Sequence, residues 1–216
     1  MLPIMTDVSH LLAMLRQQAA DLGESRCHLL PDRVITYRRL WSRIERASAR
    51  LQGEWGVQRG QTVAYVGCGH PDAIVLYGAL LRIGAVFLPL ESLPESSIKV
   101  LLADSSAALA IMDDGMSLQD VPTRPLSLLL ADWCPTDPAV VEEDPSVRAL
   151  LLPTSSGSLV PTSLLELCVA LPGRAVSTTV TGPIFTPECL THIVLPALRD
   201  GQILHFAAVE ERRTGT

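Results

Sequence analysis

The stretch Leu80–Glu91, LLRIGAVFLPLE, is where the chain passes from a helix into a buried strand. It ends the run Ala73–Leu90, whose eighteen mostly apolar residues are long enough to suggest a membrane span. An arginine, two glycines and a proline interrupt that run, however. A helix that ends at Ile83, followed by a strand at Phe87–Leu90, explains these breaks better than a transmembrane helix does. We therefore expect no membrane partner.

Strands and helices alternate on both sides of this stretch. Thr62–Val66 reads as a buried strand, Pro94 opens a helix through Leu102, and Ala107–Met112 is another apolar run. Because parallel strands need a helical crossover, this order predicts an α/β fold with a mostly parallel sheet and helices on both faces. The other expected elements are helices over Val8–Leu22, Thr36–Gly53 and Pro187–Leu198, and strands at Arg33–Thr36, Ser127–Leu130, Arg148–Leu152 and Ile203–Phe206.

The length of 216 residues and the apolar fraction of 48% are those of one folded domain. We expect an amphipathic helix over residues 1–24 that packs on the domain, an α/β domain over 25–206, and a polar tail over 207–216.

The charge pattern excludes several kinds of partner. A formal net charge of −6, with no long basic run, offers nothing to nucleic acid or anionic lipid. Lys99 is the only lysine, so a mechanism that needs one must use it or borrow one. Met1–His10 lacks the pattern of a signal peptide. Five scattered cysteines without C-x-x-C spacing indicate reduced thiols in a cytoplasmic protein and suggest no zinc site; they are Cys27, Cys68, Cys134, Cys168 and Cys189.

Four segments resemble the amino-terminal subdomain of the adenylate-forming (AMP-binding) superfamily, which includes acyl-CoA synthetases, nonribosomal peptide adenylation domains and luciferases. Ile35–Leu40 is similar to its T-Y-x-x-L helix start, and Gly56–Ala64 to its G-V-x-x-G-D-x-V-A stretch. Leu80–Glu91 closely resembles L-x-x-G-A-x-y-x-P-L-D, and Phe185–Gly201 resembles F-D-x-s…L-P-x-L-x-x-G. The matches span about Arg33 to Phe206, in the family's order.

A fifth segment, Thr154–Leu164, stands in register with the family's phosphate loop, T-S-G-T-T-G-x-P-K-G-V. In such a loop glycines turn backbone N–H groups toward the triphosphate, and hydroxyls and a lysine add donors and charge. Here Ser156 and Leu159 replace two glycines, and Thr162 and Ser163 replace the lysine and the closing glycine. We therefore do not expect ATP or AMP to bind productively, and an ordinary hydroxyl-rich connector is the preferred interpretation over a nucleotide-binding loop. The degenerate phosphate loop comprises Thr154, Ser155, Ser156, Gly157, Ser158 and Thr162.

The resemblance implies that other parts of the family's machinery are missing: the adenine-contacting segment, the acid that holds the ribose, and the carboxy-terminal lid with its catalytic lysine. Phe185 and Thr186 occupy positions of the acyl pocket and are candidates for its remnant. Thr186 stands where amino-acid-activating members carry an aspartate, which disfavours an amino-acid substrate.

Several functions remain open. The chain is either a truncated, catalytically incompetent homologue that acts as a binding or partner module, or one half of a split acyl-activating enzyme that another chain completes. A third alternative is a thiol-dependent enzyme that uses Cys68 and His70, which lie in a strand-to-helix turn; a fourth is a decayed fragment without function. If the first lobe stands alone, its face toward the second lobe should be exposed and apolar, which predicts self-association or a protein partner.

Overall fold

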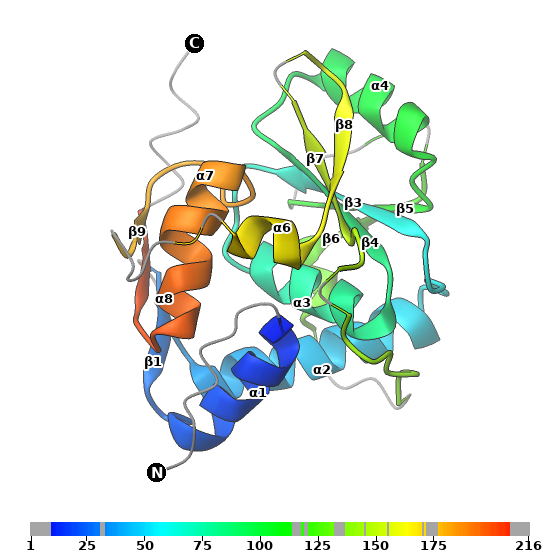
Figure 1. Ribbon diagram of the computed structural model, residues 1–216. Helices are drawn as coiled ribbons and strands as arrows, with labels where there is room; N and C mark the ends of the chain where they lie inside the picture. The colour runs from blue at the N-terminus through cyan, green and yellow to red at the C-terminus, as the bar shows by residue number, and fades with distance from the viewer. Residues whose placement is uncertain are drawn as a thin grey trace.

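A computed structural model describes residues 10–30, 33–113, 118, 121–131, 137–144, 146–154, 156–169, 171 and 177–207 of the chain. Within these ranges the strands form a six-stranded sheet and a four-stranded sheet (Figure 1).

The six-stranded sheet has the order β6-β5-β3-β4-β7-β8. Its neighbouring strands are parallel, except that β8 runs antiparallel to β7 at one edge. The prediction of an α/β fold with a mostly parallel sheet is therefore confirmed. The strands are β3 (Thr62–Gly67), β4 (Val86–Glu91), β5 (Leu109–Met112), β6 (Thr123–Pro125), β7 (Leu150–Pro153) and β8 (Leu159–Thr162).

Helices cover both faces of this sheet, as Figure 1 shows. Helices α2 (Tyr37–Gly53) and α3 (Ala73–Ile83) lie on one face and α4 (Glu95–Ser105) on the other. Successive residues of a strand point to opposite faces. Val63 and Tyr65 of β3 accordingly join the core under α2 and α3, whereas Ala64 and Val66 join the core under α4.

The four-stranded sheet has the order β2-β1-β10-β9 and brings the two ends of the described chain together. Its strands are β1 (Arg26–Leu29), β2 (Val34–Thr36), β9 (Thr179–Val180) and β10 (Leu204–Phe206). Beside it lie α1 (Leu11–Asp21) and the helical run of α7 (Pro187–Cys189), the π-helix η2 (Leu190–Val194) and α8 (Leu195–Arg199). The side-chain amide of Gln18 on α1 donates to the carbonyl of Arg199 at 3.0 Å, which ties α1 to the end of α8.

The passage from α3 to β4 depends on Gly84. This residue has a left-handed conformation, with φ of +70°, and its N–H closes the end of α3. Only glycine adopts such a conformation without a steric penalty. A Cβ here would also lie 3.1 Å from side-chain carbons of Arg59 and Val141, so the glycine also permits a close approach.

Pro89 explains why β4 and β7 separate toward their carboxyl ends. Phe87 N donates to the carbonyl of Ala149 at 2.8 Å, and Val86 N donates on the opposite side, toward Gln61. Because donors alternate along a strand, the nitrogen of residue 89 also faces β7, but proline has no N–H. Pairing between β4 and β7 is accordingly confined to Phe87 and Leu150, whereas β4 pairs with β3 along its whole length.

Two sequence predictions are wrong in detail. Ser127–Leu130, expected as a strand, lies largely in the short helix α5 (Leu126–Leu129), and β6 precedes it. Leu126 and Leu129 are buried at helical spacing and Leu128 is exposed, a pattern that the apolar run concealed. The loop expected over Thr154–Leu164 contains the strand β8.

The remaining element predictions agree with the structure within a few residues, although residues 1–9 and 208–216 lie outside the described ranges. Among the described residues, each helix is too short or too polar to cross a lipid bilayer.

Candidate functional site

The segment aligned with the phosphate loop is a tight hairpin turn between β7 and β8. Thr154 N donates to the carbonyl of Ser158 at 2.8 Å, and Gly157 N donates to the carbonyl of Thr154 at 3.0 Å. Gly157 holds a positive φ of +81°, which suits the turn. Ser155 lies outside the described residues.

The hydroxyl groups of this turn bond to one another. Thr154 Oγ1 lies 2.8 Å from both Ser156 Oγ and Ser158 Oγ, and it also accepts from Ser158 N at 3.1 Å. Ser156 Oγ and Ser158 Oγ are 3.2 Å apart. These three hydroxyls, and the N–H groups of Thr154, Gly157 and Ser158, therefore bond within the turn. A phosphate loop directs such donors toward its ligand.

The positions aligned with the lysine and the closing glycine have structural roles. Thr162 ends β8, and its hydroxyl donates to the carbonyl of Val160 at 3.2 Å. Ser163 is buried and caps α6 (Leu164–Cys168): its hydroxyl accepts from Glu166 N at 3.2 Å, and its own N–H donates to the Glu166 carboxylate at 2.7 Å. The bond from the Ser163 N–H holds the pKa of Glu166 below its usual value. This reciprocal capping fixes the start of α6.

Phe185 and Thr186, the predicted remnant of an acyl pocket, also have structural roles. The Phe185 ring is buried, with its centroid 4.7 Å from that of Phe87 and 5.7 Å from that of Tyr77. Its N–H donates to the carboxylate of Glu91 at 2.8 Å. The Thr186 hydroxyl accepts from Cys189 N at 3.1 Å and caps α7. Both residues thus join the core to the α7–α8 run.

Cys68 and His70 lie in a turn that Asp113 organises. The Asp113 carboxylate accepts from Cys68 N and from the Tyr65 hydroxyl, each at 2.8 Å. The Tyr65 hydroxyl in turn accepts from His70 N at 2.9 Å. His70 Nδ1 accepts from Asp72 N at 3.2 Å, so this ring nitrogen faces Asp72. None of these contacts joins the Cys68 thiol to the His70 ring, so they give the predicted thiol site no support.

A buried ionic cluster centred on Asp72 was not predicted. Its carboxylate accepts from Arg33 at 2.7 Å and from Arg43 at 2.6 Å. His28 is fully buried beside the cluster, and burial lowers its pKa to about 4, so the ring is neutral at pH 7. The cluster joins β1, α2 and α3, and because its members are far apart along the chain no local pattern indicated it.

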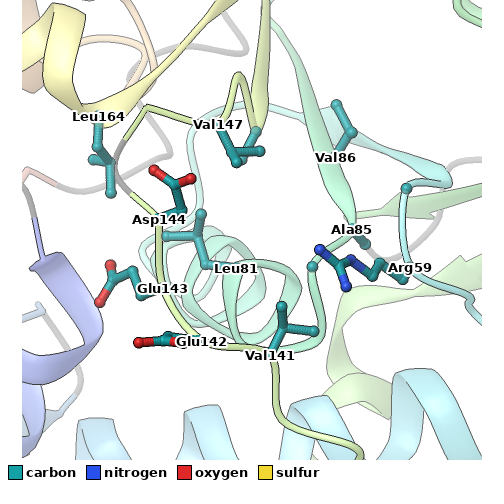
Figure 2. A pocket seen from close by; sticks show the side chains of 13 residues that line it. Arg59, Leu81, Ala85, Val86, Val141, Glu142, Glu143, Asp144, Val147 and Leu164 are labelled. Carbon is teal, nitrogen blue, oxygen red and sulfur yellow. The ribbon is translucent and has the colours of Figure 1, made fainter.

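A pocket of about 250 Å³ lies where β4 and β7 begin, at the end of the six-stranded sheet opposite the hairpin turn (Figure 2). Its walls include Leu81 of α3, Ala85 and Val86 at the start of β4, and Val141 and Val147. Figure 2 shows Arg59 on one side of the pocket and Glu142, Glu143 and Asp144 across from it.

The acidic side of the pocket is anchored by hydrogen bonds. The Glu143 carboxylate accepts from Leu12 N at 3.0 Å and Ala13 N at 3.3 Å, at the start of α1. Partial burial nevertheless raises the pKa of Glu143 above its usual value. The Asp144 carboxylate accepts from the N–H and hydroxyl of Ser146 at 2.9 and 2.6 Å, and these bonds lower its pKa. The short acidic tract was visible in the sequence, but nothing local placed it at a pocket.

In the described part of the chain no histidine, cysteine and carboxylate side chains gather in groups of three or more that could hold a metal ion.

Comparison with known proteins gives consistent matches. The family model described as AMP-binding enzyme matches residues 15–167. A carboxylic acid reductase from Mycobacterium tuberculosis is 31% identical over 91 residues, which cover 41% of this chain and 8% of that protein.

Two solved structures share the fold at lower identity. Unliganded O-succinylbenzoate coenzyme A synthetase (MenE) from Bacillus subtilis is 17% identical with a TM-score of 0.77, over 93% of this chain and 45% of that one. The amino-terminal subdomain of Klebsiella oxytoca NpsA, in complex with 3-hydroxybenzoyl-AMSN, is 21% identical with a TM-score of 0.75, over 92% and 53%. The chain thus spans about half the length of these structures and a small part of the reductase.

Proposed function

The chain belongs to the AMP-binding enzyme family, and from that premise we propose that it does not activate a carboxylic acid by itself and acts as a binding or partner module.

The observation that carries this proposal is the closed hairpin turn. The Thr154 hydroxyl and the N–H groups of Gly157 and Ser158 bond within the turn, so a triphosphate would have to displace these bonds. Each missing charge-assisted hydrogen bond would weaken binding by about 1.5–3 kcal/mol.

The sole lysine does not compensate for the missing charge. Lys99 lies on α4, where its ammonium pairs with Glu95 at 2.7 Å. Thr162, which is aligned with the family's lysine, offers a neutral hydroxyl that already donates to the backbone.

Exposed apolar side chains on α6 and β8 support the role of a partner module. Leu165 of α6 is 47% exposed, and Val169, the residue that ends α6, is 85% exposed; their spacing of four places them on one side of this helical segment. Val160 of the edge strand β8 is 46% exposed. We infer that a protein partner, or a second copy of the chain, covers this α6–β8 surface.

The test of the catalytic half of the proposal is ATP–pyrophosphate exchange by the purified chain, measured with a panel of carboxylic acids. We expect no acid-dependent exchange above the signal without protein. Acid-dependent exchange by the chain alone would contradict the proposal.

The test of the partner half is light scattering and pull-down from the native host, with the Leu165→Glu and Val169→Glu variants. We expect either change to reduce self-association or capture of a partner. Val100→Glu is the matched control, because Val100 is 57% exposed on α4, whose core lies on the other face of the six-stranded sheet from the core that α6 joins. A monomer that captures no partner, or equal loss with the control, would refute the role.

The second candidate function is one half of a split acyl-activating enzyme. The fold match to the solved NpsA subdomain favours it, because the chain matches 53% of that subdomain and a second chain could supply the rest. The distinguishing result would be exchange activity that appears only when a second chain is added.

A further inference from the structure

We propose that the pocket at the start of β4 and β7 binds a small zwitterion, whose anionic end faces Arg59, whose cationic end faces Glu142, and whose spacer is apolar. This site lies at the sheet edge opposite the hairpin turn, so the inference does not depend on the proposed function.

The walls of the pocket suit an apolar spacer. The lining residues Leu81, Ala85, Val86, Val141 and Val147 all carry apolar side chains. A volume of about 250 Å³ is at the low end for ligand sites, which usually enclose roughly 300–1,000 Å³. At about 30 Å³ per water-sized group, the pocket suits a ligand of about eight non-hydrogen atoms.

The charged groups around the pocket select the two ends of the ligand. Glu143 is bound to the start of α1, and Asp144 is bound to Ser146. Across the residue ranges that the structure describes, the side chains of Arg59 and Glu142 make neither a hydrogen bond nor an ion pair. One cation and one carboxylate therefore remain available, on opposite sides of an apolar space (Figure 2).

The pocket is built before any ligand arrives, because backbone hydrogen bonds fix its walls. Gly60 N donates to the carbonyl of Gly84 at 2.8 Å, which sets the base of Arg59 beside the end of α3. Val141 N donates to the carbonyl of Arg82 at 3.0 Å, and Ala139 N donates to the side chain of Gln52 at 2.7 Å. A preformed site loses little conformational entropy on binding.

The experiment is a titration of the full chain with ε-aminocaproate, followed by NMR chemical shifts or calorimetry. Caproate and hexylamine are the matched probes, because each keeps the spacer and lacks one charge. We expect ε-aminocaproate to bind with a dissociation constant on the order of 1 mM. Each singly charged probe should bind about tenfold more weakly or worse.

Variants assign the binding to the two side chains. Arg59→Gln should weaken ε-aminocaproate about tenfold and leave hexylamine unchanged, whereas Glu142→Gln should weaken it similarly and leave caproate unchanged. Arg124→Gln and Glu188→Gln are the controls, because both residues are exposed and neither lines the pocket. The inference is overturned if ε-aminocaproate does not bind, if either singly charged probe binds as tightly, or if Arg59→Gln or Glu142→Gln has no effect while its unfolding midpoint matches the wild type.

Discussion

The parallel strands of the six-stranded sheet begin at one edge of the sheet and end at the opposite edge. These two edges use their polar groups in different ways. At the carboxyl ends of β4 and β7, the turn Thr154–Ser158 bonds its own hydroxyls and amides together. At the amino ends of the same strands, the pocket keeps Arg59 and Glu142 on opposite sides of an apolar space. The family's chemistry is expected at the first edge, yet the second is the one that offers a preformed site.

This difference shows that the two edges of one sheet can use their polar groups in different ways. The α3–β4 passage contains Gly84 and Pro89, and the chain shares its fold with the solved structures. The hairpin that follows β7 bonds its hydroxyls to one another. The predictions below separate what the edges share from what each edge does alone.

The largest effect on stability should come from a cavity in β4, the strand that reaches both edges. Phe87 is fully buried in β4 between Tyr77 and Phe185. Phe87→Ala should lower the free energy of unfolding by about 3–5 kcal/mol, because it removes contacts and leaves a cavity. Urea denaturation measures this, with the exposed Val100→Ala as the control, expected within about 0.5 kcal/mol of the wild type. A similar loss in both variants would mean that β4 is not the shared core.

The next effect compares the same substitution at the two edges. Gly84 and Gly157 both have positive φ, but only Gly84 has close neighbours, Arg59 and Val141, each 3.1 Å from an added Cβ. Gly157→Ala should destabilise the chain by about 1 kcal/mol through backbone strain, and Gly84→Ala by about 2 kcal/mol through strain and crowding. Thermal unfolding of both variants measures the difference. Equal losses would contradict the tighter packing of the pocket edge.

A smaller effect should distinguish the edges by pH. Burial raises the pKa of Glu143, so the folded state holds the proton more tightly than the unfolded state. The resulting stabilisation is present below the ordinary glutamate pKa, about 4.3, and is lost as the pH rises through the folded-state value. The stability of the wild type relative to Glu143→Gln should therefore fall between pH 4 and pH 7, measured by urea denaturation. A difference that rises or stays constant would refute the assignment.

The smallest effect should come from the hairpin turn. Thr154→Val removes the hydroxyl that bonds to Ser156 and Ser158, and the turn is exposed. We expect a loss of about 0.5–1.5 kcal/mol, and a smaller loss for Thr162→Val, whose hydroxyl makes one such bond to the backbone. Denaturation midpoints measure both. A larger loss for Thr162→Val would show that Thr154 is not the centre of the turn.

The fold was predictable from the sequence where local rules determine it. Thr36, where a helix was expected to begin, caps α2; Gly84 ends α3, and the apolar runs form β3, β4 and β5. The prediction of a strand at Ser127–Leu130 was wrong because three adjacent leucines carry no periodicity. Pro125, which precedes them, caps the helix α5. The edge strand β8 was missed because only its pairing with β7 makes Leu159–Thr162 a strand.

The candidate sites were predicted less well, because they depend on residues that are distant in sequence. The resemblance located the phosphate-loop position, but the bonds that close the turn depend on backbone geometry. Arg59 and Glu142 line one pocket at the end of α3, and no spacing in the sequence relates them. The same holds for Arg33, Arg43 and Asp72.

The most direct measurement of the central claim is calorimetric titration of the intact chain with ATP and magnesium at pH 7. If the closed turn and the absent lysine prevent triphosphate binding, the titration will show no heat of binding at millimolar ATP. Saturable binding in the micromolar range, lost in a Thr154→Val or Ser158→Ala variant that keeps its unfolding midpoint, would contradict the account.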